Sequence, residues 1–186
     1  MAPVNRNSSF GLLFAFSCLA IVFACSHPAP ETSPVTLELV STDFASGGMM
    51  PKPLTCDGGD LSPALQWKSP PAATQSFALI ADDPDAPVGT WVHWVIFDMP
   101  PNLRSLPQSL PKTEQAADGS RQGKNDFDKI GYGGPCPPSG THRYFFKLYA
   151  LDTKLNLKPG STKKDVESAM KGHILARGEI MGRYSR

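Results

Sequence analysis

Residues 83–97 read Asp-Pro-Asp-Ala-Pro-Val-Gly-Thr-Trp-Val-His-Trp-Val-Ile-Phe, a turn rich in Asp and Pro that leads into a strand. Residues 131–149 have the same organisation. A run of Gly and Pro, Gly-Tyr-Gly-Gly-Pro-Cys-Pro-Pro-Ser-Gly, leads into Thr-His-Arg-Tyr-Phe-Phe-Lys-Leu-Tyr. Each stretch places a histidine, His93 or His142, near the start of a predicted strand, so the two stretches predict both the sheet and the site.

Strand alternation predicts the direction of each histidine. Successive side chains of a strand point to opposite faces, so one face of the first strand is expected to carry Trp91, His93, Val95 and Phe97. One face of the second is expected to carry His142, Tyr144, Phe146 and Leu148. Arg143 falls on the opposite face, where we expect it to pair with a carboxylate and hold loops in place. Either histidine alone fits a satisfied core residue, but two beside such turns favour a site.

Further apolar stretches predict a mainly β domain. Strands are expected over 36–41, 65–67, 76–82, 91–98, 142–151 and 178–184, and the 19 prolines and 16 glycines fit a fold rich in turns. One helix is expected over 161–170, with Ser161 or Thr162 as its N-cap. Residues 100–129 show little apolar pattern and are expected to form a long loop, either functional or a surface excursion without consequence.

The N-terminus resembles an export signal. Arg6 precedes an apolar run over residues 10–24 that is shorter than a membrane-spanning helix requires. We therefore expect a signal peptide over residues 1–24, a Pro- and Ser-rich tether over 25–34 and a domain over 35–186. The ending Val-Phe-Ala-Cys resembles a bacterial lipobox, which predicts lipidation of Cys25 and, with Ser26 following, a periplasmic protein anchored in the outer membrane. The alternative is a plain cleavage after Ala24 that yields a soluble periplasmic or secreted protein.

Composition excludes some classes of function. The 186 residues carry a net charge of +1 from 18 basic and 17 acidic residues, and the predicted signal peptide holds one of the basic residues and no acidic one. A neutral domain without a Lys/Arg block gives no electrostatic reason to expect nucleic acid. The sequence has no set of Cys and His at metal-ligand spacing, so we expect no metal site. It also has no dinucleotide-binding or Walker motif, so we expect no cofactor.

The two stretches together resemble the phosphatidylethanolamine-binding protein family, also called the Raf kinase inhibitor protein family. The resemblance rests on Asp-Pro-Asp-Ala-Pro followed by Trp-x-His, and on Gly-x-Gly-Gly-Pro-x-Pro-Pro leading to His-Arg-Tyr, and it covers roughly Thr36 to the C-terminus. Thr55-Cys56-Asp57-Gly58 and the cysteine in the Gly-Pro run resemble the bacterial branch of the family. The resemblance implies a Greek-key fold with a large central antiparallel sheet, a smaller sheet and a few peripheral helices.

The resemblance also implies a pocket for phosphate-like anions and phosphoethanolamine. Its ligand-binding candidates here are Asp83, Asp85, Trp91, His93, Tyr132, Gly134, Pro135, His142 and Tyr144. Imidazolium groups and the backbone N–H groups of the glycine run, arranged as an anion nest, would donate to the phosphoryl oxygens. Alternatively, Asp83 and Asp85 cap their own turns, and Trp91 and Tyr144 form walls of the pocket and make no ligand contacts.

Two cysteines flank the suspected site. Cys56 and Cys136 both fall in loops, and in an oxidising periplasm such a pair predicts a disulfide. Two free buried thiols are the alternative.

Three classes of function remain open on the sequence. The first is a binding protein for phosphate or phospholipid headgroups, with a possible regulatory role. The second is an inhibitor of a kinase or serine protease that acts through exposed residues of 100–129, although a periplasmic location removes cytosolic kinases as partners. The third, an enzyme acting on a phosphoester, is disfavoured because the chain has no nucleophile elbow and no HExxH motif.

Overall fold

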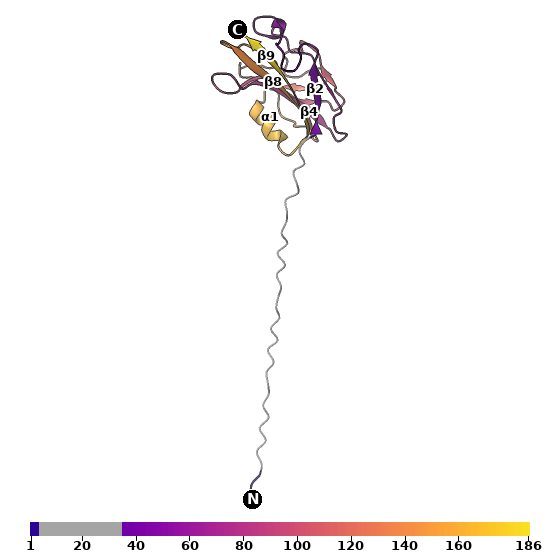
Figure 1. Cartoon of the computed structure of the whole chain (residues 1–186). Coiled ribbons are helices and arrows are strands. Elements are labelled where there is room, and N and C mark those ends of the chain that lie inside the picture. The colour runs from indigo at the N-terminus through magenta and orange to yellow at the C-terminus, as the bar shows by residue number, and fades with distance from the viewer. Residues whose placement is uncertain (4–34) are drawn as a thin grey trace. The chain divides into compact units, whose positions relative to one another are not determined.

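The computed structural model describes residues 1–3 and 35–186. Residues 4–34 lie outside the described residues. They include the predicted signal peptide apart from its first three residues, the predicted lipidation site at Cys25 and the predicted tether over 25–34. The described residues 35–186 belong to one compact unit, which is mainly β (Figure 1).

The larger sheet has six strands and carries the predicted site. In spatial order they are β1 (Val35–Thr36), β9 (Ile174–Ser185), β8 (Thr141–Leu151), β4 (Ser76–Asp83), β5 (Trp91–Met99) and β7 (Arg121–Gln122). Every pair is antiparallel except β1 with β9, which is parallel. The expected central antiparallel sheet is therefore confirmed, with one parallel pair at its edge.

The smaller sheet has three strands, β2 (Glu38–Ser41), β3 (Leu65–Lys68) and β6 (Ser105–Leu106). The strand expected over 36–41 is split at Leu37, because the chain leaves the larger sheet after β1 and enters the smaller one as β2. Residues 100–129 are not wholly structureless, since they supply β6 and β7. Gln122 in β7 is buried, and its amide group bonds Trp94 and two backbone carbonyls.

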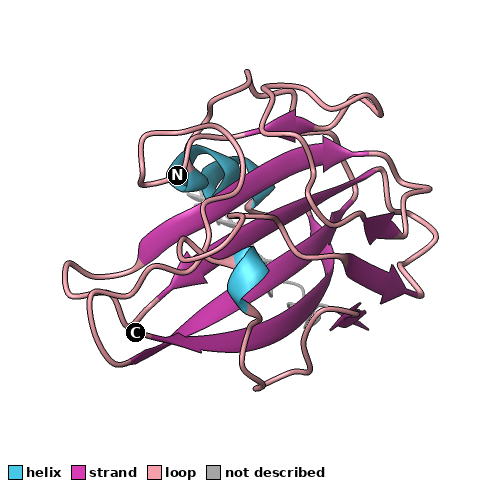
Figure 2. Cartoon of the chain, turned by 90° about the horizontal axis from the view of Figure 1, so that it is seen from above, coloured by secondary structure: helices cyan, strands magenta, loops and turns pink. Residues whose placement is uncertain are grey.

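Two hydrophobic cores lie on opposite faces of the larger sheet. The first fills the space between the two sheets and includes Trp67, Phe77, Trp94 and Phe146. The second lies under the helix α1 (Lys163–Met170), which buries Val166 and Met170 against it. Thr162 caps this helix in a capping box with Asp165. Figure 2 shows α1 and the sheet strands that it packs against, with the short 3-10 helix η1 (Lys52–Leu54) elsewhere in the loops.

No helix within residues 1–3 and 35–186 is both long and apolar enough to cross a membrane.

Candidate functional site

A β-bulge in β5 sets the direction of His93. Across the β4–β5 pair, Val92 lies opposite Asp82 and Trp94 lies opposite Ala81, so His93 is the extra residue of the bulge. The predicted common face of Trp91, His93, Val95 and Phe97 is therefore wrong. Val95 and Phe97 pack in the core under α1, whereas the ring of His93 meets the ring of Tyr144, with 5.1 Å between centroids.

The other predicted face is confirmed. β8 pairs with its neighbours without a register shift from His142 to Leu148. Tyr144, Phe146 and Leu148 belong to the core between the sheets. The bulge thus brings His93 to the face that already carries His142.

A pocket of about 210 Å³ opens between these histidines. It is lined by Asp83, Ala86, Pro87, Val88, Trp91, His93, Phe127, Cys136, Pro137, Pro138 and His142. Four of the predicted ligand-binding residues therefore line one pocket, and a fifth, Tyr144, packs against His93 beside it. Its polar end is made of two imidazoles and a carboxylate, and its rim is apolar.

His142 and Asp83 form a buried pair at the end of this pocket. The Nδ1–H of His142 donates to Oδ2 of Asp83 at 2.7 Å, and the two residues are 8% and 3% exposed. Oδ1 of Asp83 accepts from the backbone N–H of Asp85 at 2.8 Å. Asp83 therefore caps its turn and orients His142 at once, and no hydrogen bond within the described residues uses Nε2 of His142.

Asp85 faces away from the pocket. Its carboxylate accepts from Nε and Nη2 of Arg143 at 2.9 and 2.7 Å and from the backbone N–H of Arg143 at 2.9 Å. These hydrogen bonds lower the pKa of Asp85. Arg143 thus pairs with a carboxylate as expected, and the pair fastens the Asp-Pro turn to β8. Asp85 is placed to support Asp83 and does not line the pocket.

His93 is held through its own Nδ1. This nitrogen lies 2.7 Å from the carbonyl oxygen of Gly133, which can only accept, so Nδ1 carries the proton and Nε2 is an acceptor in neutral His93. The residue is 4% exposed. Burial lowers its pKa, and the hydrogen bond to Gly133 offsets only part of that effect.

This lowered pKa predicts a stability that depends on pH. Above the unfolded pKa of 6.5, His93 is neutral in both states. As the pH falls from 6.5 toward the lower folded pKa of His93, the unfolded chain takes up the proton more than the folded protein does, so the free energy of unfolding falls by at most about 1.4 kcal/mol per pH unit. Urea unfolding between pH 7.5 and pH 5, at roughly half-unit steps, measures the slope, which we expect His93→Gln to reduce.

The exposed His173 provides the control for this measurement. We expect His173→Gln to leave the slope close to that of the wild type, because the side chain of His173 is exposed and is not desolvated on folding. Equal slopes in the His93→Gln protein and the wild type would contradict the assignment.

The glycine run does not form the expected anion nest. The N–H groups of Gly131, Gly133 and Gly134 donate to Gly123 O, His93 O and Asp60 Oδ1, the last at 2.5 Å. The expectation of free amide donors is therefore wrong for these three residues. Gly134 instead allows its backbone to lie close to that of Leu54, because a Cβ at this position would lie 2.5 Å from the carbonyl oxygen of Leu54.

The pocket lining does not include Tyr132, Gly134 or Pro135. The hydroxyl of Tyr132 donates to Leu54 O at 2.9 Å, and burial raises its pKa. Pro135 O accepts from the N–H of Cys56. Tyr132 and Gly134 line a neighbouring pocket of about 280 Å³, which shares Phe127 and Cys136 with the first.

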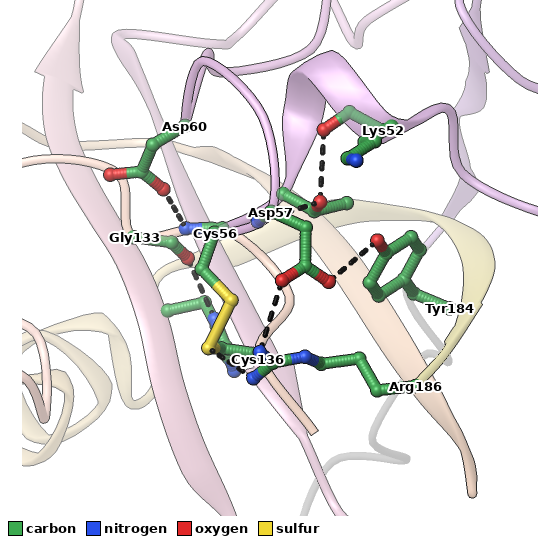
Figure 3. The surroundings of a disulfide bond; sticks show 11 residues. Lys52, Cys56, Asp57, Asp60, Gly133, Cys136, Tyr184 and Arg186 are labelled. Carbon is green, nitrogen blue, oxygen red and sulfur yellow. Dashed lines mark hydrogen bonds and ion pairs between the residues drawn. A yellow bond between two sulfur atoms is a disulfide. The ribbon is translucent and has the colours of Figure 1, made fainter. Parts of the chain in front are cut away.

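The predicted disulfide joins this scaffold. Cys56 and Cys136 are bonded, with 5.4 Å between their Cα atoms. Figure 3 shows Asp57 beside the bond, where it accepts from the Tyr184 hydroxyl at 2.8 Å and pairs with Arg186 at 3.1 Å. The C-terminus is thereby fastened to the cysteine loop that supports the pocket.

Phe127 is a site residue that the sequence analysis missed. Its ring lies edge-on to Trp91 and His93, with centroids 5.4 and 5.3 Å apart. Asn125 anchors its loop through hydrogen bonds to the N–H groups of Phe127 and Lys129 and to the carbonyl of Gly131. No periodic pattern marks an aromatic residue in a loop, so nothing in the sequence alone distinguished it.

Two buried donors at the site have no partner. Nε1 of Trp91 and the hydroxyl of Tyr144 make no hydrogen bond, although neither atom is exposed to solvent. Burial raises the pKa of Tyr144 well above its usual value, and the nearby Asp83 carboxylate adds to the rise, so Tyr144 keeps its proton. Buried donors are normally paired, and these two leave the pocket region with unused hydrogen-bonding capacity.

The described residues contain no group of three or more His, Cys, Asp or Glu side chains that could hold a metal ion.

Comparison with known proteins identifies the family to which this architecture belongs. Residues 40–185 match the model described as phosphatidylethanolamine-binding protein, which is most of the chain. The chain belongs to the phosphatidylethanolamine-binding protein family. The resemblance drawn from the two motifs is thereby confirmed.

Relatives in this family include proteins that consist of the domain alone. A UPF0098 protein of Methanothermobacter thermautotrophicus is 50% identical over 150 residues, which cover 81% of this chain and 99% of that protein. A UPF0098 protein of Aquifex aeolicus is also 50% identical, over 81% of this chain and 89% of its own. A domain of this length is therefore a whole protein in the first relative.

Solved structures of the family share the fold. A phosphatidylethanolamine-binding protein homologue from Chlamydia trachomatis is 37% identical with a TM-score of 0.75, covering 81% of this chain and 98% of its own. YbcL of Escherichia coli, described as a new member of the mammalian family, is 32% identical with a TM-score of 0.75, covering 82% and 99%. The family fold, with its larger and smaller sheets, is therefore confirmed for this chain.

Proposed function

We propose that the pocket between His93 and His142 binds the phosphate group of a phosphate-bearing small molecule or phospholipid headgroup. The observation that carries the proposal is the fixed orientation of the two imidazoles. The Nδ1 atom of His93 hydrogen-bonds to Gly133 O, and that of His142 hydrogen-bonds to Asp83 Oδ2. The Nε2 atom of each ring is therefore available to a ligand. Membership of the phosphatidylethanolamine-binding protein family supports the same class of ligand.

The donors available to a phosphate differ from those expected on the sequence. The glycine amides are used within the protein, so a bound phosphate would meet the Nε2 atoms of His93 and His142 and the unpartnered Nε1–H of Trp91, which also lines the pocket. Burial disfavours the protonated form of His93. Its neutral Nε2 can therefore accept a hydrogen bond from a phosphate oxygen that carries a proton.

The lining chemistry supports binding over turnover. The residues that line the pocket include no serine or threonine, and the one cysteine among them, Cys136, is held in the disulfide. Lipidation of Cys25 stays a prediction, and the proposed pocket does not depend on it.

Calorimetric titration tests the proposal with inorganic phosphate, O-phosphoethanolamine and short-chain phosphatidylethanolamine as probes. We expect saturable binding by the wild type and a loss of about tenfold to a hundredfold in affinity for His142→Ala, the value of one hydrogen bond to a charged group. The fold of the variant is checked by circular dichroism.

His173→Ala is the matched control, since His173 also bonds a carboxylate through Nδ1, Asp152 at 2.8 Å, but at the surface. It is expected to bind as the wild type does. The proposal fails if a folded wild-type protein binds none of the three probes, or if His142→Ala binds them unchanged.

A further inference from the structure

One face of β8 and β9 extends beyond the helix α1. The cross-strand pairs on it are Tyr149 with Arg177, Lys147 with Glu179, Phe145 with Met181, and Arg143 with Arg183. The helix α1 packs against β5 at the border of this face, where Tyr149 contacts the core beneath the helix. Phe145, Tyr149 and Met181 are only half-buried, and the β9 members Arg177, Glu179 and Arg183 are exposed. We call these eight residues the β8–β9 face.

The β8–β9 face carries two arginines without an acidic partner. Arg143 is neutralised by Asp85, and Lys147 by Asp82. Neither Arg177 nor Arg183 forms a salt bridge within residues 35–186, and Arg177 lies over the ring of Tyr149, 5.9 Å from its centroid. The one carboxylate of the face, Glu179, stands opposite Lys147. The face is therefore positive although the domain as a whole is close to neutral.

An exposed apolar side chain lies beside Arg183. Met49 is 52% exposed, one of the few large apolar residues so exposed in the described chain. It pairs with Arg183 at the outer edge of β9, so the two side chains lie on the same face. Arginines, half-buried aromatic rings and an exposed apolar side chain on one surface are the composition of proteins that lie on a membrane interface.

The chain enters the domain at this face. β1 begins at Val35, and Thr36 lies opposite Arg177. Thr36, Lys147, Tyr149 and Arg177 line a hollow of about 540 Å³ at this point. The ten residues 25–34, predicted to be a tether, span at most roughly 35 Å when extended. If Cys25 is lipidated as the sequence predicts, the β8–β9 face is held within that distance of the bilayer.

We propose that the β8–β9 face binds the surface of a bilayer that contains anionic phospholipids. Arg177 and Arg183 contact lipid phosphates, and Met49 enters the headgroup region beside them. The interaction is separate from the pocket, because it uses residues of β9 and of the segment before η1, and none of them lines the site between His93 and His142.

Vesicle sedimentation tests the proposal with the chain from Ser26 onward, which contains both cores and the length that forms a whole protein in a relative. Vesicles of phosphatidylcholine are compared with vesicles that contain phosphatidylglycerol in equal amount, so phosphatidylethanolamine is absent from both. Binding is expected to the anionic vesicles alone. Arg177→Gln with Arg183→Gln is expected to weaken it roughly 30-fold, since each cation near the surface contributes about fivefold.

Lys164→Gln with Lys171→Gln is the matched control, because it removes the same charge from exposed positions in and after α1. Its affinity for the anionic vesicles is expected to stay within about twofold of that of the wild type, whereas the loss of each arginine is expected to lower the affinity about fivefold. His142→Ala is expected to bind the vesicles as the wild type does. Equal binding to both vesicle types, no binding to either, or an equal loss in the lysine control would each overturn the proposal. A loss in His142→Ala alone would assign vesicle binding to the pocket.

Discussion

Replacing both cysteines of the disulfide, Cys56→Ser with Cys136→Ser, lowers the free energy of unfolding by about 4 kcal/mol. The bond joins residues 80 positions apart, so its loss returns the entropy of a long open loop to the unfolded chain. That amount is a large fraction of the stability of an ordinary domain. Guanidinium unfolding, followed by tryptophan fluorescence and circular dichroism, measures the change in midpoint.

The wild type reduced with dithiothreitol is the control for this prediction. Like the double variant it lacks the disulfide, but it keeps both cysteines in place of the serines. We expect the two to unfold at the same denaturant concentration. An unfolding midpoint equal to that of the oxidised wild type would show that the bond contributes nothing, for instance because loops on both sides stay ordered in the denatured chain.

Asp82→Ala is expected to cost about 3 kcal/mol, near the lower end for a broken buried ion pair. Asp82 is fully buried in β4, and its two oxygens accept from Lys147 at 2.7 Å and Lys163 at 2.6 Å. Lys147 stands on β8 and Lys163 begins α1, so the carboxylate ties the helix to the sheet. Without it, two partly buried ammonium groups lose their counter-charge.

The triple variant Asp82→Leu, Lys147→Met and Lys163→Met separates the charge effect from packing. Replacing a whole buried ion cluster with apolar residues is often neutral or stabilising, so we expect it to recover most of the loss in urea unfolding. Asp152→Ala, at an exposed pair with His173, is expected to change stability by less than about 0.5 kcal/mol. An Asp82→Ala protein as stable as this control would contradict the role given to Asp82.

Most strands were predictable because their patterns are long. Alternation over 142–151 predicted β8 to within one residue, and the apolar run over 76–82 predicted β4 equally well. The short strands β6 and β7 lie in residues 100–129 and have two residues each. A strand of two residues has no period to detect, and it forms only because a neighbouring strand offers it hydrogen bonds.

The sequence predicted which residues come together at the site better than it predicted how they are oriented. The histidines and Asp83 come together as the motifs indicated, but the face assigned to His93 was wrong because an ideal alternation cannot contain a bulge. The glycine amides were expected to be free, yet His93 O and Asp60 accept two of them. The second error arises from contacts between segments distant in sequence, which a local pattern does not record.

The pairing of the first strand with the last has a consequence for biosynthesis. β1 lies beside β9, whose pairing with β8 is the longest ladder of the domain. Contacts of such large sequence separation form slowly, because the loop between them must close first. Until β9 has emerged, β8 presents an open edge with aromatic side chains, which is a template for aggregation. This edge of β8 is therefore covered only once β9, residues Ile174–Ser185, has been synthesised.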